Sequence, residues 1–195
     1  MNNPQDSNGK KLRIIGASSS TSAGRAVNDF YATPPEAVEM LLELENFSTN
    51  ILEPCCGMGH IGKVLQAHEH HVDARDLIDR GYGVGGIDFL QCREHHLDAD
   101  IITNPPYAHA CEFVKKALEV VDCGHKIAML LKLTFLEGKE RRQLFDANPP
   151  MRIWVSSSRL ACMKNGEKFS ASCICYAWFV WEKGWHGDTV VKWFN

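Results

Sequence analysis

The four residues Asn104-Pro105-Pro106-Tyr107 combine side chains and backbone groups that could hold a planar amine. They follow a short apolar run, Asp98 to Thr103, which predicts a buried strand that ends at this turn. The two prolines lack an N–H and have a restricted φ, so the turn is stiff and its carbonyls stay outside a strand ladder. The Asn104 side-chain oxygen and the Pro105 carbonyl could accept the two hydrogens of an amine, while the Tyr107 ring stacks on the attached π-system.

An amine attached to an aromatic ring is a weak nucleophile, because its lone pair is delocalised into the ring. Two acceptors outside the ring plane favour a more tetrahedral nitrogen and so make that lone pair available. The same four residues also fit a plain proline-rich turn after a core strand, so the rest of the chain has to decide between the two interpretations.

A second candidate site is the turn from Glu53 to Gly59, Glu-Pro-Cys-Cys-Gly-Met-Gly, which follows a predicted strand. Gly57 and Gly59 let the backbone approach a ligand closely, and Glu53 can accept a hydrogen bond from an ammonium group or a bound water. The Gly-x-Gly-x-x-Gly spacing of a dinucleotide site is not kept, and the carboxylate would repel an anion. The turn therefore favours a cationic or zwitterionic ligand over a pyrophosphate.

Two aspartates follow at the ends of the next predicted strands. Asp76 is placed where a carboxylate can hold the two hydroxyls of a ribose, and Asp79 is a nearby alternative. Asp88 could accept from an adenine amine while Phe89 packs on the ring. A single aspartate is more often solvated, but this placement at successive strand ends favours one shared site.

Alternating strands and helices must position these residues. A helix is expected after Thr33 as N-cap and Pro34 as the first helical residue. Strands are predicted at 51–53, 72–77, 87–89, 98–103, 126–133, 152–155, 172–181 and 190–194, and further helices at 61–67, 108–121 and 138–148. This alternation predicts an α/β fold with an open, doubly wound, mostly parallel sheet and a C-terminal antiparallel hairpin. Ligands of such sheets bind at the carboxyl ends of the strands, where the candidate residues lie.

The length of 195 residues predicts a single domain, residues 29–195, after a flexible basic arm, residues 1–28. The net charge of −3 gives no overall basic field, so a nucleic acid would have to bind a local patch. No apolar run reaches the ~20 residues of a membrane span, and no membrane association is expected. The eight cysteines of an α/β chain indicate reduced thiols and a cytoplasmic location.

Other reactive side chains give weaker signals. The adjacent Cys55 and Cys56 have no histidine and aspartate placed to activate a thiol, so we interpret them as small loop residues. The histidine clusters do not have the spacing of a tetrahedral metal site, and no metal is expected. These clusters are His68, His70 and His71, and His95 and His96 near Cys92.

Taken together, these residues resemble the class I S-adenosylmethionine-dependent amino-methyltransferases, in particular the adenine-N(6) DNA methyltransferases with the gamma-type motif order. The resemblance covers nearly the whole chain after the arm. The motifs in chain order are Tyr31-x-Thr33-Pro34, Glu53 to Gly59, Asp76, Asp88, and Asn104 to Tyr107. The small size, the Asp88-Phe89-Leu90 step and the segment 176–184 are similar to the compact methyltransferases of phages and prophages.

The resemblance implies S-adenosyl-L-methionine as cofactor and a flipped adenine in DNA as the group that Asn104 to Tyr107 hold for methylation. It also implies a single methyltransferase catalytic domain at 29–195. Residue 60 is a histidine rather than an aromatic, which leaves the packing on the cofactor adenine to Ile61 or Phe89. The cofactor-binding residues that it implies are Tyr31, Thr33, Pro34, Glu53, Cys55, Gly57, Gly59, Asp76, Asp88, Phe89 and Asn104.

Target recognition has no domain of its own in this interpretation, so specificity is expected from loops, from a very short DNA site, or from a partner, and a homodimer stays open. The long polar loop 156–172 is locally basic through Arg159, Lys164 and Lys168, which we predict to contact DNA phosphates, while Phe169 closes over the extruded base. A plain surface loop with incidental lysines is the alternative.

Other substrates and another class of protein remain open. The Asn-Pro-Pro-Tyr turn can hold any planar amine, so an RNA adenine or a protein glutamine is an alternative substrate. A catalytically silent cofactor-binding subunit is the alternative from a different class, although the intact Asn104 and Glu53 to Gly59 turn argue against it.

Overall fold

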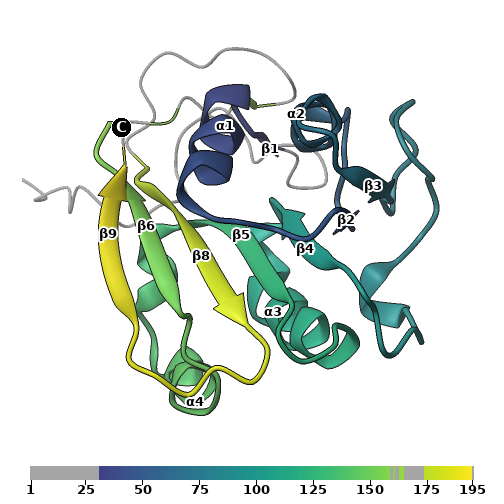
Figure 1. The fold of residues 1–195 in the computed structure, drawn as a ribbon. Coiled ribbons are helices and arrows are strands. Elements are labelled where there is room, and N and C mark those ends of the chain that lie inside the picture. Colours follow the sequence, from purple (N-terminus) through teal and green to yellow (C-terminus); the bar gives the residue numbers. More distant parts are fainter. Residues whose placement is uncertain (1–30, 159, 161–162, 165–173, 195) are drawn as a thin grey trace, which may run out of the picture.

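The computed structural model describes residues 31–158, 160, 163–164 and 174–194, and Figure 1 shows their arrangement. The predicted arm, residues 1–28, lies outside the described residues. So do Arg159, Lys168 and Phe169, and only the backbone of Lys164 is described.

Seven strands form one twisted sheet in the order β3-β2-β4-β5-β8-β6-β9 (Figure 1). All neighbours run parallel except β8, which is antiparallel to both β5 and β6. The predicted open, mostly parallel α/β sheet is confirmed, with antiparallel pairing in its C-terminal part. The predicted hairpin of the last two strands is wrong, because β8 lies between β5 and β6 whereas β9 pairs parallel with β6. The strands are β2 (Asn50–Glu53), β3 (His71–Ala74), β4 (Asp100–Thr103), β5 (Lys126–Lys132), β6 (Arg152–Ser156), β8 (Tyr176–Glu182) and β9 (Val190–Phe194).

Helices cover both faces of this sheet (Figure 1). α1 (Pro35–Leu44) and α2 (His60–Ala67) pack on one face, and α3 (Ala110–Val120) and α4 (Lys139–Ala147) pack on the other. Among the described residues, no helix is long and apolar enough to cross a membrane.

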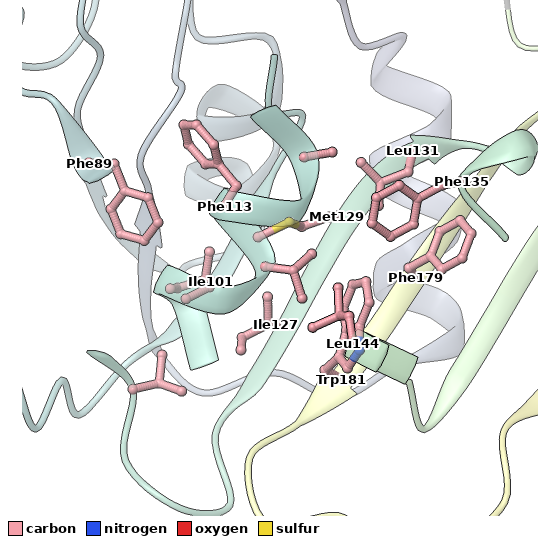
Figure 2. Close-up of a cluster of buried hydrophobic side chains, with 14 of the residues drawn as sticks. Phe89, Ile101, Phe113, Ile127, Met129, Leu131, Phe135, Leu144, Phe179 and Trp181 are labelled. Carbon is pink, nitrogen blue, oxygen red and sulfur yellow. The ribbon is translucent and has the colours of Figure 1, made fainter. Parts of the chain in front are cut away.

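The two faces of the sheet serve two hydrophobic cores, because successive side chains of a strand point to opposite sides. In β5, Ala128 and Leu130 belong to the core under α1 and α2, whereas Ile127 and Met129 belong to the core under α3 and α4. Figure 2 shows the second core, in which Met129 lies among side chains from α3, β5 and β8. A strand buried on both faces is continuously apolar, and this explains the unbroken apolar run at β5.

The start of α1 corrects one expectation. Pro34 is the extended N-cap residue and Pro35 is the first helical residue, one position later than predicted. A residue that precedes a proline is disfavoured in the helical region, so Pro35 keeps Pro34 out of the helix. The Thr33 side chain does not cap α1.

The region between β3 and β4 corrects a second expectation. The strand predicted at 87–89 is absent, and Phe89–Gln91 forms a 3-10 helix that Asp88 caps by accepting from the Leu90 N–H at 3.0 Å. The β3 strand ends at Ala74, after which Arg75 forms an isolated bridge with Val84. The glycine-rich loop returns beside the end of β3, where Val84 exchanges backbone hydrogen bonds with Ala74 and Asp76.

The long polar segment after β6 also contains a short strand. β7 (Met163–Lys164) pairs antiparallel with β1 (Tyr31–Ala32), so that Tyr31 faces Lys164 and Ala32 faces Met163. This two-stranded sheet joins the segment predicted to bind DNA to the segment that leads into α1.

Candidate functional site

A cavity of about 330 Å³ lies at the carboxyl ends of the parallel strands, where α/β sheets bind ligands. It brings together residues from five stretches that are far apart in the sequence. The predicted site residues that line it are Tyr31, Thr33, Glu53, Cys55, Asp76, Asp88, Phe89, Asn104 and Pro106. Five other predicted site residues do not line the cavity, although Gly57, for example, donates to the lining residue Asp76. These five are Pro34, Gly57, Gly59, Pro105 and Tyr107.

Glu53 ends β2 and is one of the most deeply buried carboxyl groups of the described chain, at 1% exposure. Burial raises the pKa of Glu53 well above its usual range, and the neighbouring Asp76 carboxylate raises it further. Its Oε2 atom has no hydrogen-bond partner among the described residues. A buried polar atom of this kind costs free energy, which a ligand that donates a hydrogen bond would recover.

Tyr82 packs against the Glu53 to Gly59 turn and the start of α2, a contact that we did not expect from the sequence. A Cβ atom on Gly59 would lie 2.6 Å from the Tyr82 ring, and one on Gly62 would lie 2.3 Å from its hydroxyl and 2.7 Å from Glu53 Oε2. A side chain at Gly62 would therefore push Tyr82 or Glu53 aside, and one at Gly59 would meet the ring and would also strain a backbone φ of +80°. The Tyr82 hydroxyl and Glu53 Oε2 converge over Gly62, and neither has a hydrogen-bond partner in the described structure.

A lone aromatic residue in the glycine-rich loop 81–86 was the available signal for Tyr82. The backbone of this residue is also tied to the turn, because the Cys56 thiol donates to the Tyr82 carbonyl at 3.2 Å. Lys63 in α2 places its ammonium group 5.4 Å from the centre of the ring. The glycine-rich loop thus packs over the Glu53 to Gly59 turn and holds its shape.

Asp76 connects the same turn to the end of β3. Its Oδ2 accepts from the Gly57 N–H at 2.8 Å, and its Oδ1 accepts from the Ile78 N–H at 2.8 Å and from Arg80 at 2.9 Å. Two carboxylate oxygens offer about four lone-pair sites, so one more donor can be accepted. Asp76 therefore orders the turn through Gly57, and its role toward ribose hydroxyls stays a prediction.

Asp88 and Phe89 form the wall of the cavity beside α3. Asp88 is half-buried and holds the Leu90 N–H. The Phe89 ring is 3% exposed and lies 5.5 Å from the ring of Phe113, centre to centre. Contacts of these two residues with an adenine remain predictions.

Asn104 lies directly after β4, and a distant part of the chain sets its orientation. Its Nδ2 donates to the Tyr31 carbonyl at 2.7 Å and to the Thr33 hydroxyl at 3.1 Å. A carbonyl oxygen can only accept, so the amide nitrogen, and not its oxygen, faces β1. Within the described part of the chain no group donates to Asn104 Oδ1, which is left as an acceptor.

No protein-family model matches this sequence, and no curated protein matches it. Solved structures do match. A protein from Listeria monocytogenes, described as a "putative class I S-adenosylmethionine-dependent methyltransferase", aligns with a TM-score of 0.61 and 13% identity, over 88% of this chain and 68% of that one. A "putative RNA methyltransferase" from Pyrococcus horikoshii aligns with a TM-score of 0.57 and 16% identity, over 78% and 87%.

A third match is the modification subunit of a "putative type I restriction enzyme" from Vibrio vulnificus. It aligns with a TM-score of 0.58 and 14% identity over 85% of this chain, which spans 47% of that subunit. This chain has the class I methyltransferase fold. At identities this low, the likeness extends to the fold alone.

Tyr107 takes an unexpected place within the class I fold. Its ring lies 5.8 Å from the ring of Tyr31 in a stacked arrangement and 5.9 Å from that of Tyr176, while the Lys132 ammonium lies 4.8 Å from its centre. The Tyr107 ring is therefore in contact with two other rings at the mouth of β4. The stacking of a base on Tyr107 stays a prediction.

The two adjacent cysteines of the class I fold's first turn are poor nucleophiles. Burial raises the pKa of Cys55 well above its usual range, with Asp76 contributing. Burial and the nearby Glu53 raise the pKa of Cys56 to about 12. Because the thiolate is the reactive form, both residues are neutral loop residues at physiological pH, as their sequence context indicated.

No group of three or more histidine, cysteine, aspartate or glutamate side chains among the described residues is arranged to hold a metal ion.

Proposed function

We propose that this chain transfers a methyl group from S-adenosyl-L-methionine to the exocyclic amine of an adenine in DNA. The observation that carries the proposal is the orientation of Asn104. Its amide nitrogen is held by Tyr31 and Thr33, so its oxygen is the group available to a substrate.

The cavity supports the cofactor part of the proposal. Its volume of about 330 Å³ is within the range of sites for small ligands. Its carboxyl groups Glu53, Asp76 and Asp88 suit a ligand with an ammonium and a sulfonium group better than a phosphate. The unpartnered Oε2 of Glu53 is a direct acceptor for such an ammonium group. When bound, the cofactor would supply an electrophilic methyl group on a sulfonium.

The substrate part follows from the number of hydrogens on the accepting group. An amine on an aromatic ring carries two hydrogens, which can meet the Asn104 oxygen and the Pro105 carbonyl at once. A hydroxyl carries only one. Holding the substrate nitrogen in a fixed position toward the bound cofactor would contribute to the rate, because it converts a bimolecular step into a unimolecular one.

DNA is the substrate favoured by the motif order and by the fold likeness to a restriction-modification subunit. An adenine has to leave the base stack before its amine can enter the site, at a cost of about a few kcal/mol. Contacts of Arg159, Lys164 and Lys168 with phosphates, and a homodimer or a specificity partner, belong to this proposal. The likeness to an RNA methyltransferase favours RNA adenine as the second candidate.

The test is transfer of a labelled methyl group to duplex DNA, to RNA and to protein in parallel, with wild type and Asn104→Ala. We expect label on DNA adenine, and a loss of turnover of about a hundredfold or more in the variant, which corresponds to about 2.7 kcal/mol. Cofactor affinity, measured by calorimetry, should change by less than about threefold. Asn46→Ala, which alters an exposed asparagine at the opposite edge of the sheet, is the matched control.

Two outcomes would overturn parts of this proposal. Label only on RNA or only on protein would replace the substrate. Turnover above a tenth of wild type in Asn104→Ala would exclude Asn104 as the amine acceptor.

A further inference from the structure

We propose that Thr33 is a positioning residue, whose hydroxyl, together with the Tyr31 carbonyl, holds the Asn104 amide with its oxygen toward the target amine. This inference rests on the proposed function and assigns the Thr33 hydroxyl a partner other than the cofactor. From the sequence, Thr33 was expected to bind the cofactor. In the structure its hydroxyl contacts Asn104, which lies 71 positions away in the sequence.

The two hydrogen bonds specify which way the amide points. If the Asn104 side chain turned by half a rotation, its oxygen would face the Tyr31 carbonyl oxygen at the present 2.7 Å, and two acceptors would repel each other. The nitrogen would then face the substrate, where one donor would meet another. The correct orientation is therefore a requirement for holding an amine.

The hydrogen bond to Thr33 restricts a rotation of the Asn104 amide that the bond to Tyr31 alone would allow. One hydrogen bond allows the amide to rock about the bond that joins it to the side chain, because this torsion has a broad energy profile. The second bond, at 3.1 Å, gives the same nitrogen a second acceptor from another direction and so restricts this rotation. Because Thr33 is only 2% exposed, bulk water cannot readily replace a deleted hydroxyl there.

The backbone around Thr33 is held on both sides. Tyr31 and Ala32 pair with β7, and Pro35 starts α1, whose Ala37 and Val38 are fully buried under the sheet. Thr33 is also β-branched and has few accessible rotamers. The acceptor pair that orients Asn104 is therefore rigid before any substrate arrives.

Thr33→Val removes the hydroxyl with little change in shape, and Thr33→Ser keeps the hydroxyl while removing a methyl group. For Thr33→Val we expect kcat to fall by about tenfold or more, with cofactor affinity within about twofold of wild type, and Thr33→Ser to regain most of the loss. A tenfold fall corresponds to about 1.4 kcal/mol. Thr49→Val, which makes the same change at an exposed threonine outside the site, is the matched control.

An NMR measurement tests the orientation without catalysis. The side-chain amide protons of Asn104, identified by their loss in Asn104→Ala, should exchange slowly with solvent in the wild type. In Thr33→Val their exchange should be faster by about tenfold, and in Thr33→Ser it should be close to wild type. This readout keeps the inference testable even if the methyl-transfer assay identifies no substrate.

Three outcomes would overturn the inference. The first is a Thr33→Val protein that keeps its kcat while Asn104→Ala is inactive, in which case the proposed function survives. The second is a Thr33→Val protein that loses cofactor affinity by more than tenfold at unchanged kcat, which would return Thr33 to the cofactor site. The third is unchanged exchange of the Asn104 amide protons in Thr33→Val.

Discussion

Two buried glutamates, one at the amino ends of the strands and one at the carboxyl ends, show how differently the two ends of the sheet are built. Glu45 follows α1 beside the amino ends of β5 and β6 and is 4% exposed, and Glu53 ends β2 at the cavity and is 1% exposed. Burial raises the pKa of both, but in Glu45 hydrogen bonds from Arg152, Trp154 and Lys126 outweigh it and lower the pKa to about 2. In Glu53 burial prevails, and the pKa is raised.

The difference lies in the number of donors that reach each carboxylate. Glu45 accepts from Arg152 Nη2 at 2.7 Å, from Trp154 Nε1 at 2.9 Å and from Lys126 Nζ at 3.0 Å. Glu53 has one oxygen without a partner among the described residues. Similar burial thus has opposite consequences: the carboxyl group of Glu45 ties α1 to two strands, while that of Glu53 keeps an unpartnered oxygen at the cavity.

The largest expected effect is on stability, and it comes from Glu45, whose carboxylate has hydrogen-bond partners. Glu45→Gln should lower the free energy of unfolding at pH 7 by about 3 kcal/mol, because it removes the buried carboxylate that accepts from Arg152 and Lys126. Urea denaturation measures this change. The contribution of Glu45 is present above pH 4.5, its unfolded pKa, and should fade as the pH falls from there toward 2.

Glu43→Gln is the control for this change, since Glu43 lies on the exposed side of the same helix. It should alter stability by less than about 0.5 kcal/mol. Equal effects of the two substitutions would mean that the Glu45 contacts contribute nothing beyond a surface charge.

On the open side of the comparison, Glu53→Gln should stabilise the ligand-free protein at pH 8 by about 1–2 kcal/mol while weakening cofactor binding. The raised pKa means that Glu53 opposes folding as the pH rises from 4.5 toward its folded value, because over this range the carboxyl ionises in the unfolded chain and stays protonated in the core. Glutamine carries no such penalty, so the two melting curves should converge below pH 4.5. A Glu53→Gln protein that is less stable at pH 8 would contradict this view of Glu53.

The smallest expected effect concerns His125, which directly precedes β5 and so lies at the same end of the strands as Glu45. Burial lowers its pKa, but hydrogen bonds and charges from Asp100 and Asp98 outweigh this, so the pKa is raised above 6.5. Its stabilising charge is therefore fully present below pH 6.5 and is lost as the pH rises through the higher folded value. We expect about 1 kcal/mol of stability to disappear over this window in the wild type but not in His125→Gln, as thermal melts from pH 6 to 9 would show.

His71→Gln, at an exposed histidine on β3, should leave that pH dependence unchanged. A wild-type profile that is flat above pH 6.5 would mean that the Asp98 and Asp100 contacts do not favour the charged ring.

Much of the fold followed from the sequence because it depends on local patterns. The alternation of apolar strand segments with helical segments predicted a sheet covered by helices on both faces, and the structure confirms it. The same alternation placed Glu53, Asp76 and Asn104 at strand ends, and parallel strands bring their carboxyl ends to one edge of the sheet. Where two local signals competed, as at Pro34 and at 87–89, the prediction was wrong.

Only the tertiary structure decided which partners these residues have. Nothing near Asn104 in the sequence indicates that the Tyr31 carbonyl, 73 residues away, takes its amide nitrogen. Nothing near Gly59 indicates that the Tyr82 ring occupies the space a side chain would need. The sequence likewise does not predict how many donors surround Glu45 and Glu53. A sequence pattern reports which residues lie on one face of an element, whereas the direction of a hydrogen bond depends on which other element packs there.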